Sequence, residues 1–125
     1  MTQQANIDMV RQFVREVLNT NDRSRIADFV TPDFVRHDAV RVENGTVDVE
    51  RFLQERHETY TELEWRIDQI VAHGDYVAAA MSGRGLHAGT GREVTGKGVA
   101  LMQIRDGKIA SSSTEWDRSN FVEAV

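Results

Sequence analysis

The feature that most constrains the fold is an Asp106-Gly107 pair between two strand-like stretches, 97–105 and 108–117. Such a pair favours a two-residue hairpin turn, which fixes the pairing register of the two strands. Counting outward, Arg105 opposes Lys108 and Ile104 opposes Ile109. Side chains alternate between the two faces of a strand. One face of the hairpin is therefore predicted to carry Lys97, Val99, Leu101, Gln103, Ser112, Thr114 and Trp116. Both faces of the hairpin mix polar and apolar groups, so we expect at least one of them to line a cavity or a subunit contact.

The first half of the chain shows helical periodicity. Apolar residues at 7, 10, 14, 17 and 18 predict an amphipathic helix over 5–19. A short helix with Ile26 and Phe29 follows, and Pro32 forbids its continuation. Residues 34–40 are typical of a strand. After the turn at 44–45, Thr46 or Asp48 is expected to cap a third helix, whose apolar stripe is Val49, Phe52, Leu53 and Tyr60.

The second half of the chain is predicted to form strands. Trp65, Ile67, Gln69 and Val71 alternate with polar residues, and turns at 73–75 and 89–92 separate further strands over 76–87 and 93–105. Helices followed by a meander of strands predict an α+β fold, in which the helices pack on one face of a curved antiparallel sheet. Glycines inside the strands, at 83, 85, 96 and 98, indicate bulges or bends. We expect one domain over 1–125.

Composition excludes several classes of protein. A net charge of −5 and a pI near 5.3 argue against nucleic-acid binding, which needs a basic surface. The sequence has no apolar run long enough for a membrane helix, no cysteine and no signal-peptide pattern at its start, so a cytoplasmic protein is expected. The histidines lack a metal-ligand spacing, and phosphate-binding glycine motifs are absent. We therefore expect no metal and no cofactor.

Several segments together resemble the SnoaL-like, polyketide-cyclase-related branch of the nuclear transport factor 2-like superfamily. They are 17–22 (VLNTND), 30–38 (VTPDFVRHD), 70–75 (IVAHGD), 85–87 (GLH), 90–92 (TGR) and 104–109 (IRDGKI). The tail, 116–125 (WDRSNFVEAV), is similar to the end of limonene-epoxide-hydrolase-like members. The resemblance implies a cone-shaped fold with an apolar pocket between sheet and helices, and usually a homodimer. It implies no single chemistry, because this fold hosts many functions.

The same resemblance directs attention to certain residues. The cyclases and epoxide hydrolases place a catalytic Asp about five residues after the Gly-Lys-Ile motif, where this chain has Thr114. Asp117 is the next acid along the strand, and it also suits the N-cap of a short helix over 118–123. His37 matches a cyclase-type histidine and could act as a base. Its neighbour Asp38 must point to the other side of the strand, so only one of the two is expected to face the cavity.

Other candidates have structural explanations that compete with a functional one. His57 lies on the apolar stripe of the third helix, where a hydrogen-bonded core histidine is the simpler interpretation. Arg84 could bind an anionic ligand group or form a surface salt bridge. Lys97, Leu101, Gln103, Thr114 and Trp116 would line the pocket if their shared face is the inner one. Alternatively, Lys97 stacks over Trp116 near the sheet edge.

Three kinds of function stay open. The first is a cyclase- or isomerase-like enzyme acting on an apolar carbonyl compound, with His37 or Asp38 as base and Lys97, Gln103 or Thr114 stabilising an oxyanion. The second is a non-catalytic protein that binds a small apolar or aromatic ligand, and the third is an interaction module with an exposed sheet face. A limonene-epoxide-hydrolase-like hydrolase needs two carboxylates and an arginine around one water, and Thr114 replaces the expected acid.

Overall fold

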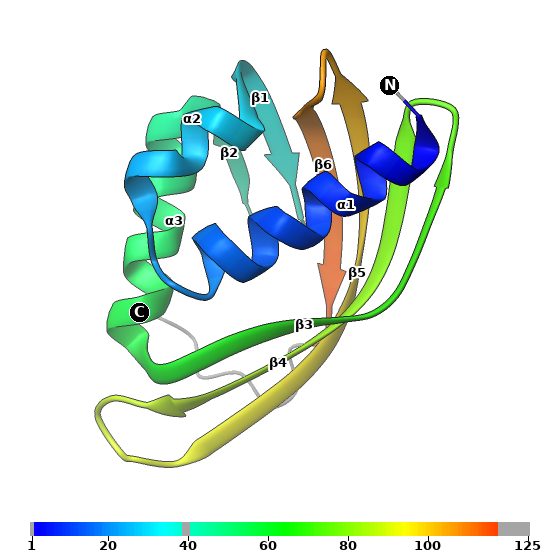
Figure 1. Cartoon of the computed structure of the whole chain (residues 1–125). Coiled ribbons are helices and arrows are strands. Elements are labelled where there is room, and N and C mark those ends of the chain that lie inside the picture. Colours follow the sequence, from blue (N-terminus) through cyan, green and yellow to red (C-terminus); the bar gives the residue numbers. More distant parts are fainter. Residues whose placement is uncertain (1, 39–40, 118–125) are drawn as a thin grey trace.

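The computed structural model describes residues 2–38 and 41–117 of the chain. Its strands form one sheet in the order β2-β1-β6-β5-β4-β3, and the helices pack against one face of that sheet. Figure 1 shows the long strands bending around α1, which crosses this inner face. The expected α+β architecture, with helices on a curved sheet, is confirmed.

The helices begin near the predicted positions. α1 (Gln3–Phe13) is capped by Thr2, whose side chain accepts a hydrogen bond from the Ala5 N–H, and a π-helical segment, η1 (Val14–Leu18), extends it. The 3₁₀ turn η2 (Arg23–Arg25) leads into α2 (Ile26–Phe29). α3 (Gly45–Thr59) starts where Asp48 accepts a hydrogen bond from the Asn44 N–H at 2.8 Å, which satisfies a donor at the helix start. α3 ends at Thr59, so the prediction that Tyr60 lies on the apolar stripe of this helix is wrong: Tyr60 is the first residue of the next strand.

The six strands are β1 (Val30–His37), β2 (Val42–Asn44), β3 (Tyr60–His73), β4 (Tyr76–His87), β5 (Glu93–Arg105) and β6 (Lys108–Trp116). β3 to β6 form the expected antiparallel meander. β1 pairs with β6 in parallel, so the expectation of a wholly antiparallel sheet is wrong for this pair. β1 also starts before Pro32. The register between β1 and β6 shifts around this residue, so the missing N–H of Pro32 removes no hydrogen bond from the regular part of the ladder.

The turn at Asp106-Gly107 is confirmed, but the register beyond it differs from the prediction. Both residues have positive φ, and the pairs next to the turn are those expected. One extra residue on β6 then opposes Gln103, so that Ala100 pairs with Thr114 and Gly98 with Trp116. This bulge reverses the faces of the outer half of β6 relative to β5. Ser112, Thr114 and Trp116 consequently share the inner face with Ala100 and Met102, whereas Lys97, Val99, Leu101 and Gln103 point outward.

A second register shift changes β3 in the same way. Trp65 and Ile67 pack against the core as expected, but the register shifts between Ile67 and Gln69. Ile70 and Ala72 then continue the inner face, and Val71 is 64% exposed. The predicted single alternation over Trp65, Ile67, Gln69 and Val71 was therefore wrong after Ile67. In both strands the shift lets apolar residues an odd number of positions apart lie on one face.

The core lies between the inner sheet face and the helices. α1 and η1 supply Val10, Phe13, Val14 and Val17, α3 supplies Val49 and Leu53, and the strands supply Val77, Ala79, Met81, Ala100, Met102, Ile104 and Ile109. The end of η1 is tied to the sheet by Asn19. Its side chain accepts from the Trp65 N–H at 2.7 Å and donates to the Trp65 carbonyl at 2.9 Å. This pairing holds Trp65 beneath the helices.

Candidate functional site

Two adjoining cavities lie between the helices and the inner face of the sheet. The larger, of about 110 Å³, is lined mainly by apolar side chains from α1, β1, α3 and the meander, including Phe13, Phe34, Phe52, Met81 and Met102. The smaller, of about 60 Å³, extends toward Tyr60 and Leu63. The two cavities share Arg36, Phe52, Trp65 and Trp116, and the chain has only two tryptophans. A concave, mainly apolar space with a few polar groups is the usual form of a small-molecule site.

Trp116 reaches this site because two strands provide glycines beneath its ring. A Cβ on Gly98 would lie 2.5 Å from the Trp116 Cδ2 atom, whereas a Cβ on Gly83 would lie 3.7 Å from the ring. Gly98 therefore allows a close approach that no other residue permits. The sequence predicted a bulge or bend at these glycines. At Gly98 the structure shows a different role, because the absence of a side chain leaves space for the Trp116 indole. Lys97 faces away from Trp116, so the alternative interpretation, in which the two side chains stack, is wrong.

A cluster of charged side chains forms one wall of the cavities. Arg36 on β1 and Glu43 on β2 are directly opposed across the hairpin, and the Arg36 Nη1 atom lies 2.9 Å from Glu43 Oε2. The same Nη1 atom lies 3.3 Å from Asp38 Oδ2. The side chains of Arg36, Asp38 and Glu43 are only 12%, 2% and 6% exposed. In a buried cluster of this kind, removing one charged side chain leaves its partner as an uncompensated buried charge.

The cluster is held from two sides. The guanidinium of Arg36 lies over the Phe52 ring, with its Cζ atom 4.3 Å from the ring centroid. Asp38 and Arg41 exchange hydrogen bonds: the Arg41 N–H donates to Asp38 Oδ1 at 2.8 Å, and the Asp38 N–H donates to the Arg41 carbonyl at 3.1 Å. Asp38 thus borders the smaller cavity in a fixed orientation.

The alternative between His37 and Asp38 is resolved by the pleat of β1. Asp38 lies on the side of Arg36 and Phe34, and its side chain is buried. His37 is exposed on the other face of the sheet, and its backbone carbonyl accepts a hydrogen bond from Thr114 Oγ1 at 3.3 Å. Thr114 itself lies inside and borders the larger cavity together with Ser112.

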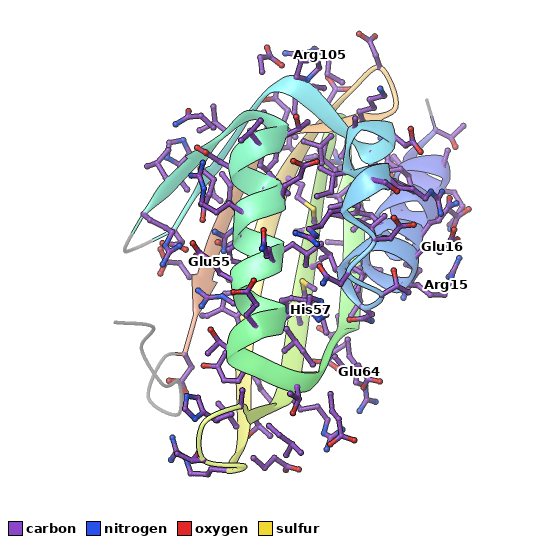
Figure 2. All side chains as sticks on the ribbon, turned by 90° about the vertical axis from the view of Figure 1, so that its left-hand side faces the viewer. Arg15, Glu16, Glu55, His57, Glu64 and Arg105 are labelled. Carbon is purple, nitrogen blue, oxygen red and sulfur yellow. The ribbon has the colours of Figure 1, made fainter. Side chains whose placement is uncertain are left out.

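His57 occupies a structural position between α3 and the end of η1. Its Nε2 atom lies 2.8 Å from the Leu18 carbonyl, and since a carbonyl only accepts, Nε2 carries the proton. Its ring meets Trp65 edge-on at 5.9 Å. Figure 2 shows His57 and Glu55 on opposite sides of α3. The interpretation of His57 as a hydrogen-bonded histidine of the core agrees with this geometry.

The remaining candidates lie on the outer surface or at the cavity mouth. Arg84 forms an exposed ion pair with Glu93 at 3.1 Å and borders the smaller cavity. Arg84, Lys97 and Asp117 share a surface groove, and the Asp117 N–H donates to the Lys97 carbonyl at 2.8 Å. Leu101 and Gln103 point outward from β5. The expected terminal helix over 118–123 lies outside the described residues.

The outer face of the sheet forms a second, open concavity of about 570 Å³. Its wall includes His37, Val71, Val99, Leu101 and Glu115, and the three apolar side chains are 64%, 57% and 48% exposed. It lacks the phenylalanine and tryptophan lining of the inner cavities, and of their charge cluster only Asp38 borders it. We therefore take the inner cavities as the candidate site.

Sequence reasoning did not single out Arg36 and Glu43, and it placed Phe52 and Trp65 in apolar patterns without assigning them to the site. Arg36 is two residues after Phe34, so it shares the inner face of β1, and this spacing could have revealed it. No such signal pointed to Glu43. Alternation would place its apolar neighbour Val42 inside and Glu43 outside, whereas in the structure Val42 is 52% exposed and Glu43 is buried. Within residues 2–38 and 41–117, no group of His, Cys, Asp and Glu side chains has the arrangement of a metal site. In the same ranges, no helix has the length and apolar character to cross a bilayer.

Comparisons with known proteins identify the fold and the family. Residues 10–112 match the family model of the SnoaL-like domain. TsrD from Streptomyces laurentii has a similar structure, with a TM-score of 0.85 at 20% identity over 96% of this chain and 93% of the other. IdmH from Streptomyces antibioticus, a candidate polyketide cyclase, gives a TM-score of 0.80 at 23% identity, with 92% and 94% covered.

An LEH-like epoxide hydrolase from M. tuberculosis is also similar, with a TM-score of 0.78 at 18% identity over 94% of this chain and 86% of the other. No curated protein sequence matches the chain closely enough to indicate a relationship. At these identities the structures support the fold, and the match over most of the chain supports the family. The chain therefore belongs to the SnoaL-like family, with the nuclear transport factor 2-like fold.

Proposed function

We propose that the protein is a cyclase- or isomerase-type enzyme that moves a proton on a small apolar carbonyl compound bound in the inner cavities. The observation that carries this proposal is the buried Asp38 carboxylate, 3.3 Å from Arg36 at the wall of an aromatic cavity. An oriented carboxylate shielded from water is suited to accept a proton from a carbon next to a carbonyl. His37 faces the other side of the sheet, so Asp38 is the base in this proposal.

The developing oxyanion needs donors within the two adjoining cavities, which Arg36 borders on both sides. Of the residues first considered, Lys97 and Gln103 point outward and only Thr114 lies inside. Arg36 and Ser112 also border the larger cavity. The proposal therefore assigns oxyanion stabilisation to Arg36 and to the Ser112 and Thr114 hydroxyls, since preorganised donors in a dry site act strongly on developing charge.

The test uses both tryptophans, because both border the cavities. Candidate ketones and 1,3-dicarbonyl compounds are titrated into ¹⁵N-labelled protein while the two indole Nε1–H signals are followed by NMR. Compounds that shift these signals are then incubated with enzyme and analysed for products. We expect turnover by the native protein, at least a hundredfold less turnover by Asp38→Asn, and indole shifts in both. Indole shifts without turnover of any compound would instead favour a non-catalytic binding protein.

A hydrolase related to limonene-epoxide hydrolases is the second candidate. The observation that favours it is that Arg36 is bracketed by two carboxylates, Asp38 and Glu43, which is the set of groups required around one water. These carboxylates come from β1 and β2 and not from the Thr114 position. Small cyclic epoxides belong in the same product assay, and conversion of an epoxide to a diol, without conversion of carbonyl compounds, would select the hydrolase.

We also propose that the outer concavity is a homodimer interface. Val71, Tyr76, Val99 and Leu101 expose apolar side chains on one sheet face, and patches of this kind mark contact surfaces. We expect Val99→Glu with Leu101→Glu to convert a dimer into a monomer in sedimentation-velocity experiments, because like charges would face each other across a symmetric contact. Val47→Glu, at an exposed site on α3, is the control. A native protein that sediments as a monomer at micromolar concentration would refute the interface.

A further inference from the structure

One carboxylate oxygen of the charge cluster has no hydrogen-bond partner. Glu43 Oε2 pairs with Arg36, whereas Glu43 Oε1 is buried and finds no partner among the described residues. A buried charged oxygen without a partner carries a substantial desolvation cost. Native structures retain such groups where a water, an ion or a ligand satisfies them. Glu43 therefore calls for an explanation beyond the packing of β1 and β2.

The position of Glu43 indicates what can satisfy it. Glu43 borders the larger cavity, whose other lining is dominated by Phe13, Phe34, Phe52 and apolar strand residues. The volume of about 110 Å³ suits a single ring. A molecule in this space would contact apolar surface almost everywhere, with polar contacts confined to one end. That end is where β2, β1 and β6 meet, because Arg36 pairs with Glu43 on one side and with Ser112 on the other, and Thr114 borders the same cavity.

The open acceptor on Glu43 favours a ligand donor over a ligand acceptor. Glu43 Oε1 is buried at the cavity wall and has no hydrogen-bond partner among the described residues. The Arg36 Nη1 atom is already shared by both carboxylates. The other N–H groups of Arg36 can still meet a ligand oxygen, but an oxygen that only accepts leaves Glu43 Oε1 unsatisfied. A ligand hydroxyl or ammonium group would instead donate a hydrogen bond to this acceptor.

We propose that Glu43 selects the ligand of this cavity by accepting, through Oε1, a hydrogen bond from a hydroxyl or ammonium group on an otherwise apolar ring. This inference rests on the proposed function, since it concerns the same cavity, and it narrows the substrate class. The substrate is then a ring compound that carries a donor at one end in addition to the carbonyl group on which Asp38 acts. Glu43 acts as a specificity-determining residue and takes no part in proton transfer.

The test compares matched ring compounds by the shifts of the two tryptophan indole signals. Cyclohexanol and cyclohexylamine carry a donor, whereas methoxycyclohexane and cyclohexanone only accept. In native protein we expect at least one donor compound to bind about tenfold more tightly than both acceptors, the usual effect of a hydrogen bond to a charged group. Tighter binding of cyclohexanol identifies a hydroxyl ligand, and tighter binding of cyclohexylamine identifies a cationic one.

Glu43→Gln supplies the second arm, because glutamine has nearly the same shape but adds a donor. We expect this variant to lose the tenfold preference and to bind cyclohexanone at least as well as cyclohexanol. Glu55→Gln, an exposed position on the opposite side of α3 from His57 (Figure 2), is expected to keep the native preference. The native series stands without the variant, so a Glu43→Gln protein that fails to fold leaves the test valid.

Two results would overturn the proposal in distinguishable ways. If all four probes shift the indole signals with equal affinity, the cavity binds small molecules but Glu43 does not select them, and the proposed function survives. If none of the probes, and none of the carbonyl compounds tested above, shifts either signal, the cavity is not a binding site and both proposals fail.

Discussion

Replacing Arg36 with methionine is expected to lower the free energy of unfolding by about 3–5 kcal/mol. Methionine approximates the volume of the arginine stem, so the loss comes from charge and not from a cavity. Asp38 and Glu43, whose side chains are 2% and 6% exposed, would be left with like charges and no cation within the cluster. The stacking of the guanidinium on Phe52 would be lost as well. Urea unfolding followed by circular dichroism measures the change.

Two further variants separate charge from packing. Arg84→Met removes an exposed arginine that is paired with Glu93, and it is expected to cost at most about 1 kcal/mol. The triple variant Arg36→Met, Asp38→Asn, Glu43→Gln removes all three charges, so it should recover at least half of the loss caused by Arg36→Met. A triple variant less stable than Arg36→Met would show that the carboxylates are not what destabilises the single variant.

Gly98→Ala is expected to destabilise the protein by about 3 kcal/mol, because it overpacks a site with no room for a methyl group. The added Cβ would lie 2.5 Å from Trp116 Cδ2 and 2.7 Å from the Glu115 carbonyl oxygen. A side chain can rotate away, but the backbone carbonyl is held in the sheet. We expect Trp116 to leave its place between the two cavities, which a shift of its indole Nε1–H signal and weaker binding of cyclohexanol would report.

Gly83→Ala is the matched control, since its Cβ would meet the same ring at 3.7 Å, an ordinary contact. This variant is expected to change the stability by no more than about 1 kcal/mol. Combining Gly98→Ala with Trp116→Leu should cost less than the sum of the two single changes, because removing the indole relieves the clash. Equal stability of the Gly98→Ala and Gly83→Ala proteins would contradict the close approach of Trp116 to β5.

The wrong register of the last hairpin has a simple physical origin. A turn fixes pairing only as far as the ladder is regular, and the extra residue near Ala110 breaks it after two pairs. Ile109 and Trp116 are seven positions apart, so strict alternation would put them on opposite faces. Burying both requires one bulge. Ile67 and Ile70 on β3 are three positions apart, which is also an odd spacing, and there too the register shifts.

Local signals in the sequence determined the order of the elements, the turn at Asp106-Gly107, the helices and the α+β fold, because turns and apolar periodicity act over a few residues. The alternation of side chains along a strand also predicted that the neighbours His37 and Asp38 point to opposite sides. Only the tertiary structure decided which of them faces the cavity, where the bulges fall, and that Glu43 on a short edge strand is buried against Arg36. Those outcomes depend on contacts between distant segments, and burial of a charge becomes acceptable only when its partner is already in place.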